Sequence, residues 1–479
     1  MNQIVFNLST SEKRAAILQD GKVVEILVER PDAYPKAGNI YMGRITKVLP
    51  GIDAAFIDIG FAQNGFIHAT DLKRYKEDQG AINELVHEGQ WIIVQVRREA
   101  SKNKGPLLVE NITIPGENLV YLPFGGHVAV SKKLSEREKE EVKRIGESII
   151  HNPEGLIMRT SSSQCDMDQL KEEVDVLRQE WNAIESRGGR KVSLLYEGST
   201  IVDTALNHHS NGTAELIFDD VDVFRTFRNK YQDRFETKLY KGTENVFSYY
   251  DIEQVIQKAL RPMQWLANGG QIQVDTTEAL TVIDVNTGKF TGKQDRESAI
   301  LETNLLAAEE AARQLRLRNI SGMIVIDFIR MKEEEHKQKV QKRLHEHLQR
   351  DPVHTKIYGY TALGLMEVTR QKVRDSLVAL MTENDSSQPS YNVETMFYAL
   401  ERTLFEFRHI EEEAIWIELS PRLYDYVNDS DCDRENRLSS GVPSKLFFTK
   451  NKVSDPYGFR VRQQGSLEKI EARINKELH

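Results

Sequence analysis

The stretch EALTVIDVNTG, residues 278–288, alternates apolar and polar side chains as a β-strand does. Period-two alternation places Val282, Asp284 and Asn286 on one face of the strand and Ile283 on the other. An acidic side chain is unusual within so apolar a strand, so its presence indicates a structural or a chemical role. The residues that follow therefore decide whether this aspartate is structural or chemical.

The next segment predicts a helix and a second strand. Its apolar residues recur at the spacing of an amphipathic helix. They are Leu301, Leu305, Ala308, Ala312 and Leu315. GMIVIDFIR (322–330) then forms a second apolar run. Strand, helix and strand in this order predict a right-handed βαβ unit with parallel strands. If the strands are neighbours, Asp284 and Asp327 lie about 4.8 Å apart near the carboxyl ends.

Two carboxylates this close favour a cation between them. Mg²⁺, with oxygen ligands at roughly 2.0–2.1 Å, is the simplest solution, and ligands favour this edge of an open sheet. Asn286 could orient one carboxylate. In the alternative interpretation, Asp284 caps a strand end and Asp327 pairs with an arginine of the helix. The candidates, Arg313, Arg316 and Arg318, also suit a solvated helix face. Spacing leaves both interpretations open.

Composition indicates an ordinary globular protein. The chain has 479 residues, a net charge of −9, 39% hydrophobic and 29% charged residues, and two cysteines. At roughly 150 residues per domain we expect three or more domains. The N-terminus lacks a signal-peptide core and no apolar run reaches membrane-spanning length, so we expect a cytoplasmic protein without a membrane segment. Without a CxxC motif or a Cys/His cluster, neither a disulfide framework nor a structural zinc site is expected.

Elsewhere the chain alternates β-rich and helical segments. Residues 3–8 and 15–30 predict strands, the latter with a hairpin turn at Asp20-Gly21. Glycine-punctuated short strands from Gly38 to Ile112 predict a small barrel. Two helices, at 134–149 and 166–186, flank a strand at Gly155–Met158. The polar stretch around Pro389 predicts a linker before a last α/β unit.

Several long motifs resemble one family. EALTVIDVNTG, ETNLLAAEEAARQLRLRNISGMIVIDFI (302–329) and GLMEVTRQKV (364–373), in this order, resemble the catalytic core of the ribonuclease E/G family. GNIYMGRITKVLPGIDAAFIDIGFAQNGFIH (38–68) is similar to its RNA-binding barrel, an OB-fold of the ribosomal S-one type. GLIMRT (155–160) resembles its 5′-monophosphate sensor. The resemblance covers about residues 1–385, and such ordered motifs are far more specific than a single short pattern.

The resemblance implies an α/β and α+β multidomain fold. An OB-fold RNA-binding barrel is inserted in a ribonuclease-H-like subdomain, and a DNase-I-like catalytic subdomain and a small α/β tail domain follow. The implied boundaries are 1–37 and 190–265 for the ribonuclease-H-like parts, 38–112 for the barrel, 113–189 for the sensor, 266–385 for the catalytic subdomain, 386–392 for the linker and 393–479 for the C-terminal domain.

Site residues follow from the matched motifs. Asp284 and Asp327 fall on the family's metal-binding aspartates and Asn286 on the supporting asparagine. The implied activity is a Mg²⁺-dependent, single-strand-specific endoribonuclease. By family analogy, Mg²⁺ polarises the scissile phosphate and supplies an activated water, leaving 5′-phosphate and 3′-hydroxyl ends. The implied substrates are rRNA precursors and mRNA, preferably with a 5′-monophosphate.

Two further sets of residues would hold RNA. Strand parity separates Phe56 from the core-facing Ala55 and Ile57, so Phe56 and Phe66 could stack unpaired bases, each worth on the order of 1–3 kcal/mol. The alternative is that both phenylalanines are core. The resemblance adds Lys104 as a phosphate contact. Arg159 and Thr160, at the end of a strand, suit a terminal phosphate, and the alternative is a polar turn.

The sequence also departs from the family. The cysteine pair that shares a zinc ion between subunits is absent from 376–392, so any homodimer is expected not to be held by zinc. Its contacts would then come from one face of a tail helix, unless that face is intramolecular core. The face comprises Met396, Phe397, Leu400, Leu404 and Phe407. Arg330 replaces an expected acid. A non-catalytic RNA-binding or ribosome-assembly protein, or a nuclease acting on DNA, stays a rival interpretation.

Overall fold

The computed structural model describes most of the chain. Described residues are 2–31, 35–73, 75, 79–99, 105–132, 134–208, 214–231, 235–287, 296–383, 390–429 and 433–477. They form two compact units, one made of Met1–Pro31 with Ile201–His479 and the other of Asp32–Thr200. Lys104 and Cys432 lie outside the described residues.

The second unit contains a closed barrel. Its strands, in ring order, are β4 (Ile40–Leu49), β5 (Ala54–Asp58), β6 (Gly65–His68), β8 (Leu107–Val109) and β7 (Trp91–Arg98). β7 pairs back onto β4 and closes the ring. The barrel predicted from the glycine rhythm is confirmed. β13 (Ser193–Tyr196), expected with the ribonuclease-H-like part, instead pairs with β4.

A small α/β module follows the barrel. Its sheet comprises β11 (Val128–Val130), β12 (Gly155–Met158), β10 (Leu119–Leu122) and β9 (Ile114–Pro115). The predicted helices are present as α3 (Glu136–Ile149) and α4 (Met167–Ser186). Ser135 and Asp166 cap them by accepting hydrogen bonds from backbone N–H groups three residues on. The two helices bury Val142, Leu170 and Trp181 against the sheet.

The first unit begins with a five-stranded sheet. Its order is β15 (Glu236–Leu239), β14 (Ala214–Phe218), β1 (Asn2–Asn7), β2 (Lys13–Gln19) and β3 (Lys22–Glu29). β1 pairs in parallel with β14, so segments on either side of the barrel in the sequence share one sheet. The hairpin turn at Asp20 and Gly21 has φ of 50° and 75°, as predicted. The sheet is accompanied by α5 (Ile201–His208), α6 (Val221–Tyr231), α7 (Val246–Tyr249) and α8 (Ile252–Ala259).

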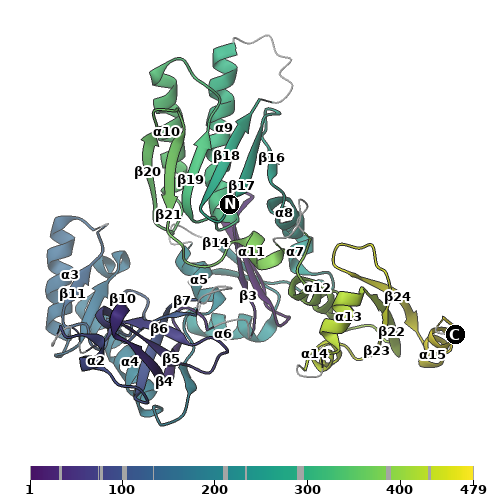
Figure 1. The fold of residues 1–479 in the computed structure, drawn as a ribbon, viewed down its shortest axis with the longest axis horizontal. Helices are drawn as coiled ribbons and strands as arrows, with labels where there is room; N and C mark the ends of the chain where they lie inside the picture. Colours follow the sequence, from purple (N-terminus) through teal and green to yellow (C-terminus); the bar gives the residue numbers. More distant parts are fainter. Residues whose placement is uncertain are drawn as a thin grey trace. The chain divides into compact units, whose positions relative to one another are not determined.

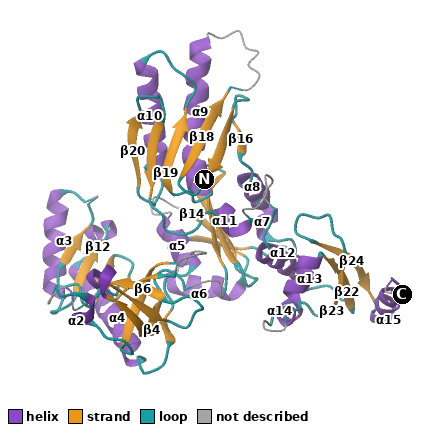
Figure 2. Cartoon of the chain, viewed as in Figure 1, coloured by secondary structure: helices purple, strands orange, loops and turns teal. Residues whose placement is uncertain are grey.

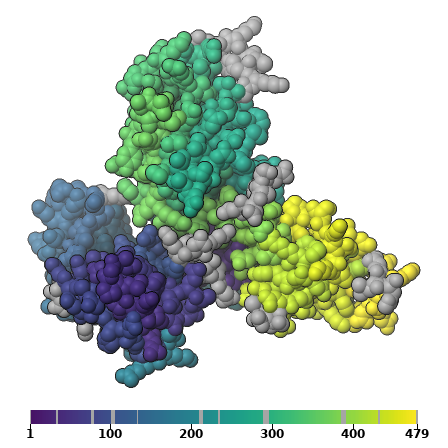
Figure 3. Space-filling view, in the orientation of Figure 1, coloured from purple at the N-terminus to yellow at the C-terminus, as the bar shows by residue number. Residues whose placement is uncertain are grey.

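A second sheet of this unit, here called the β16–β21 sheet, holds both aspartates (Figures 1 and 2). Its order is β16 (Met263–Trp265), β17 (Gln271–Thr276), β18 (Leu280–Asn286), β19 (Gly322–Asp327), β21 (Met366–Arg370) and β20 (Thr355–Tyr360). α9 (Arg296–Leu317) and α10 (Glu334–Leu348) pack on one face. In the space-filling view this part is drawn in teal to green (Figure 3).

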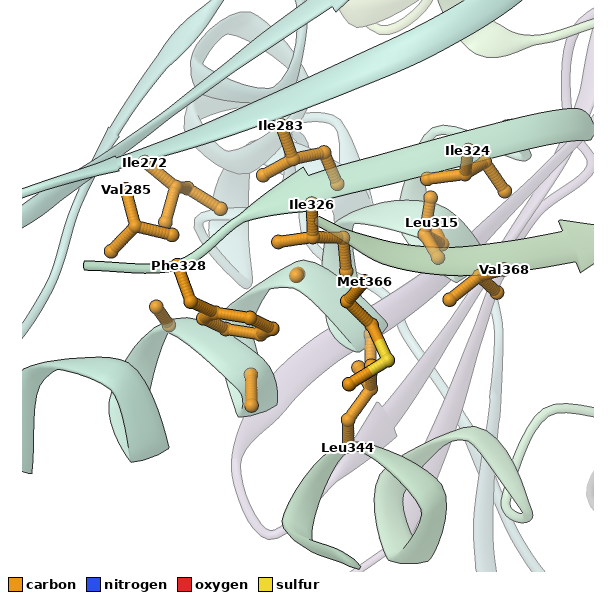
Figure 4. Close-up of a cluster of buried hydrophobic side chains, with 14 of the residues drawn as sticks. Ile272, Ile283, Val285, Leu315, Ile324, Ile326, Phe328, Leu344, Met366 and Val368 are labelled. Carbon is orange, nitrogen blue, oxygen red and sulfur yellow. The ribbon is translucent and has the colours of Figure 1, made fainter. Parts of the chain in front are cut away.

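Alternating residues of the central strands make the core between sheet and helices. Ile283, Ile326 and Met366 point from three neighbouring strands toward Leu315 of α9 and Leu344 of α10 (Figure 4). Burying each such side chain stabilises the fold by about 1.5–3 kcal/mol. Because these residues face the helices, the residues between them face away from the helices. The aspartates belong to that second set.

Buried ion pairs connect distant segments of this unit. Glu25 of β3 is 1% exposed and accepts hydrogen bonds from His208, Arg316 and Arg374 at 2.8–2.9 Å. Burial alone would raise the pKa of Glu25, but these partners hold that pKa well below its ordinary value. Glu12 likewise pairs with Arg30 and Arg402. These pairs join β3 to α9 and the N-terminal segment to the C-terminal part.

The C-terminal part is a three-stranded sheet with helices. Its elements are α11 (Leu377–Met381), α12 (Val393–Glu406), β22 (Ala414–Leu419), α13 (Pro421–Val427), α14 (Arg434–Ser440), β23 (Lys445–Lys450), β24 (Phe459–Gly465) and α15 (Leu467–Glu477). The predicted apolar face of α12 lies inside this part. Phe397, Leu400 and Leu404 are buried in its core, with Met396 and Phe407 packed against them. The intramolecular interpretation is confirmed, and the expectation that a homodimer would use this face is wrong.

Two other features bear on the expectations. Of the expected linker, residues 386–389 lie outside the described residues, while Tyr391 stacks on Tyr457 and Asn392 caps α12. Among the helices that the structure describes, none combines the length and apolarity needed to cross a bilayer.

Candidate active site

Asp284 and Asp327 lie directly opposite each other on neighbouring parallel strands. The register of β18 and β19 pairs Asp284 with Asp327, and each lies at or near the carboxyl end of its strand. Parallel strands lie about 4.8 Å apart. Asp284 is half-buried and Asp327 exposed. The predicted βαβ unit and the placement of these two residues, here called the carboxylate pair, are confirmed.

Asn286 contacts the pair as its spacing suggested. Its Nδ2 donates a hydrogen bond to Oδ2 of Asp284 at 2.5 Å. Both side chains are on the helix-free face of β18, since the residues between them are buried on the other face. The amide therefore fixes the orientation of one carboxylate.

The arginines at the end of α9 are engaged elsewhere. Arg313 pairs with Glu310, and Arg316 with Glu25. Arg318 donates to Gln314 at 2.5 Å and to a backbone carbonyl. Arg316 and Arg318 are 4% and 3% exposed, and burial lowers the pKa of Arg318 to about 10. The alternative of a pair with Asp327, and that of a solvated helix face, are both wrong within the described chain.

Two consecutive buried residues of α9 hold the loops beside the carboxylate pair. Asn304, 0% exposed, donates to the carbonyl of Ile329 at 2.8 Å and accepts from its N–H at 3.0 Å. Thr303 accepts a hydrogen bond from Asn268 at 2.8 Å, in the turn between β16 and β17. The side-chain amide of Asn304 thus holds the loop after Asp327 through both its N–H group and its oxygen. Sequence reasoning missed these residues, although Asn304 falls within the apolar phase of the helix.

The carboxylate pair suits a hard cation such as Mg²⁺ better than a structural zinc ion. Among the described residues, no group of three or more His, Cys, Asp or Glu could hold a metal ion. Mg²⁺ is usually held by one or two carboxylates, and waters and substrate phosphates complete its octahedron. A structural zinc site needs four nitrogen or sulfur ligands. Two aspartates with an open side match the first pattern.

Arg330 stands three residues past Asp327, where the resemblance led us to expect an acid. Its side chain is exposed and forms no ion pair with any described residue. The position therefore carries a positive charge three residues along the chain from Asp327. Such a charge attracts phosphate and opposes a second cation.

The predicted aromatic residues of the barrel form a row on its surface. Phe56 and Phe66 are register partners with ring centroids 5.6 Å apart, and His68 lies 4.8 Å from Phe66. Both phenylalanines are half-buried, whereas Ala55 and Ile57 are fully buried in the barrel. The alternative that they belong to the barrel core is therefore not supported. Lys104 lies outside the described residues.

Arg159 and Thr160 lie where the strand of the small α/β module ends. Arg159 follows β12 directly and precedes a 3₁₀ helix, Thr160–Gln164. Burial lowers the pKa of Arg159, and Glu173 partly offsets this effect. The hydroxyl oxygens of Thr160 and Ser131 are 3.0 Å apart. A partly buried guanidinium beside hydroxyls gains stability from a bound anion.

The carboxylate pair lies on the helix-free face of the sheet. A cavity of about 300 Å³ lies instead between the β2–β3 hairpin, α9 and the end of α10, where Lys22, Glu310 and Arg350 line it. None of Asp284, Asn286 and Asp327 lines this cavity. Small-molecule sites are usually concave and enclose their ligands. The placement outside the cavity therefore suits a polymeric substrate.

Comparisons with known proteins agree with these observations. The model of the ribonuclease E/G family matches residues 113–373, and that of the S1 RNA binding domain matches 34–108. The chain is 32% identical to ribonuclease G of Haemophilus influenzae over 449 residues, 89% of this chain and 91% of the relative. It is 33% identical to ribonuclease G of Escherichia coli over 430 residues, 85% of this chain and 88% of the relative. It is 34% identical to ribonuclease E of a Nostoc species over 381 residues, 76% of this chain and 55% of the relative. Since a family model covers more than half of the chain and these relatives align along most of it, the protein belongs to the ribonuclease E/G family.

Proposed function

We propose that this chain, an endoribonuclease by family, hydrolyses single-stranded RNA at the carboxylate pair with the help of Mg²⁺. The products would carry 5′-phosphate and 3′-hydroxyl ends. One observation carries the proposal: Asp284 and Asp327 are register partners on an open sheet face, at the carboxyl ends of parallel strands. Ligand sites of α/β sheets favour this edge.

Each residue has a defined task. Asp284 and Asp327 would hold the cation, and Asn286 keeps Asp284 in one orientation through its 2.5 Å hydrogen bond. Asn304 keeps the chain after Asp327 in place. Bound Mg²⁺ would supply Lewis-acid polarisation of the scissile phosphate and acidify a water. No side-chain nucleophile is required.

The second unit supplies candidates for holding RNA. Phe56 and Phe66 would stack unpaired bases, and Lys104 would contact a phosphate. Arg159 with Thr160 would bind a 5′-monophosphate, which explains a preference for RNA with that end. The proposed substrates are rRNA precursors and mRNA in the cytoplasm. The first unit would comprise ribonuclease-H-like and DNase-I-like subdomains and the tail domain.

Two other functions make different predictions. A non-catalytic RNA-binding protein would not need two carboxylates in register with an amide bonded to one of them. Hydrolysis of DNA would use the same pair, because metal-assisted attack on a phosphodiester does not need the ribose 2′-hydroxyl. The match of the barrel to an RNA-binding domain favours RNA.

One experiment separates these functions. The purified protein is incubated with an unstructured RNA carrying a 5′-monophosphate or a 5′-triphosphate, and with DNA of the same sequence, in Mg²⁺ or EDTA. We expect Mg²⁺-dependent internal cleavage of RNA, faster with the monophosphate. Binding without cleavage would support the non-catalytic protein, and equal cleavage of DNA would contradict the substrate assignment.

A further inference from the structure

The helix-free face of the β16–β21 sheet carries large apolar side chains that remain exposed. The most exposed of them lie on strands at both edges and in the centre. They are Met263 (43%), Trp265 (66%), Val282 (37%), Met323 (56%) and Tyr358 (58%). Among the described residues of these strands, none of the exposed large apolar side chains lies on the opposite face, which α9 and α10 cover. Polar residues of β17 and β21 separate these apolar side chains, so the face is a mixed surface with apolar positions at both edges and in the centre.

Strand register places the first edge of this surface relative to the carboxylate pair. Met263 of β16 lies opposite Gln273, which in turn lies opposite Asp284. Trp265 holds the corresponding position beside Asn286, two strands away. At about 4.8 Å per strand, these two side chains begin about 10 Å from the carboxylate pair. Because β16 is the edge strand, Trp265 also borders the cavity, whose other lining residues come mainly from the β2–β3 hairpin, α9 and the end of α10.

The other edge is occupied by Tyr358. Val325 of β19 lies opposite Glu367 of β21, and Glu367 lies opposite Gly359 of β20. Tyr358 directly precedes Gly359 at the bulge of β20, so it too is about two strands from β19. The ammonium group of Lys356 is 4.5 Å from the centre of its ring. One exposed aromatic residue therefore stands on each edge strand, with the carboxylate pair on the two central strands.

Acidic residues on the same face restrict what can cover it. Asp275 lies opposite Val282, and Glu367 opposite Val325, so four carboxylates share the face. A second protein or a lipid surface would bury these charges, which is costly without partners. A nucleic-acid duplex would present its phosphates to them while hiding its bases. A single strand can turn its bases to the apolar residues and keep most phosphates in water.

We propose that this face is a track for unpaired RNA that crosses the strands, with Trp265 and Tyr358 each stacking a base on opposite sides of the scissile phosphate. The proposal rests on the proposed function and adds the path of the substrate. Base stacking on an aromatic side chain does not depend on sequence. The track therefore selects single strands without selecting a base.

The test measures RNA binding apart from cleavage. In a background of Asp284→Asn, Trp265→Ala and Tyr358→Ala are compared for the affinity of an unstructured oligonucleotide with a 5′-hydroxyl, by fluorescence anisotropy at fixed salt and Mg²⁺. We expect each variant to bind about fivefold to a hundredfold more weakly, the range of one lost base stack. Trp265→Phe and Tyr358→Phe should keep most of the affinity. Val176→Ala, at an exposed residue of α4 (58%), is the control and should change nothing.

Three results would overturn the track. Affinities within twofold of the parent in both alanine variants would exclude stacking, and a loss in only one variant would exclude a path across the sheet. A dimer that dissociates in the alanine variants, seen by sedimentation, would assign the face to a second copy of the chain. Cleavage by the wild-type protein is measured in parallel, so that failure of the track and failure of the proposed function are told apart.

Discussion

Asn304 of α9 bonds both polar backbone groups of Ile329, two residues beyond Asp327, through contacts of 2.8 and 3.0 Å. The amide is fully buried, so no water can replace it. A helix on the covered face of the sheet thereby fixes a loop at the open edge. The contact holds the backbone that directly follows Asp327.

Asn304→Ala should therefore impair the metal site while the protein stays folded. Residues that hold metal ligands in place typically contribute about 10- to 100-fold in metal affinity or activity. We expect cleavage to need a higher Mg²⁺ concentration, as measured by titrating the rate with Mg²⁺. Val340→Ala, which removes a buried side chain of α10, should lower stability but leave the Mg²⁺ dependence unchanged. The same Mg²⁺ dependence in Asn304→Ala would show that the contact is only structural.

Asp284→Asn and Asp327→Asn should each abolish cleavage without unfolding the protein. Each change removes a charged ligand from a site for a hard cation. Neither residue has an ion pair with a described residue, so stability should change little. Thermal melting and cleavage assays on the same samples provide the measurement. Wild-type turnover in either folded variant would refute the assignment.

Phe56→Ala should weaken binding of unstructured RNA by about 1–3 kcal/mol. The ring is half-buried and stands beside Phe66 outside the barrel core. Affinity at fixed salt is the measurement, and Phe56→Trp should restore it. If Phe56→Ala binds normally but melts earlier, the ring contributes to packing alone.

Stability of the second unit should fall in acid because of Glu154. Burial alone would raise the pKa of Glu154. Hydrogen bonds from Arg178, from the backbone N–H of His151 and from Tyr121 outweigh this effect and lower the pKa from 4.5 to about 2. A lowered folded-state pKa contributes stability above about pH 4.5, and this contribution is lost as pH falls toward 2. The difference in melting temperature between wild type and Glu154→Gln should be largest near neutral pH and shrink in that window. A constant difference would mean that ionisation of Glu154 is irrelevant.

Zinc should not hold subunits together. The stretch 376–392 has no cysteine, and Cys165 is half-buried beside the carbonyl of Ser161. A shared zinc site with four sulfur ligands needs a local pair of thiolates from each chain. Light scattering with and without a zinc chelator tests this. A dimer that dissociates on chelation with stoichiometric release of zinc would contradict the prediction.

The local elements and the placement of both aspartates at strand ends follow from the amino-acid pattern alone. Apolar residues recur every second residue in β18 and about every 3.6 residues in α9, and both periods are visible in the sequence. A strand, helix and strand in a row allow essentially one handedness, which brings Asp284 and Asp327 to the same edge of the sheet if their strands pair. The register that sets them directly opposite each other is a feature of the folded sheet. The hairpin turn at Asp20-Gly21 likewise follows from neighbouring residues alone.

The partners of the buried polar groups depend instead on long-range contacts in the folded chain. The sequence left Arg316 free to pair with Asp327 or to face solvent, and the fold instead places it against Glu25, a residue of β3 far away in sequence. The apolar face of α12 is likewise ambiguous in the sequence, because a pattern shows which side of a helix is covered but not what covers it. Local periodicity is set by backbone geometry within a few residues. The choice of a partner for a buried charge or amide depends on which distant segment the whole chain brings into contact.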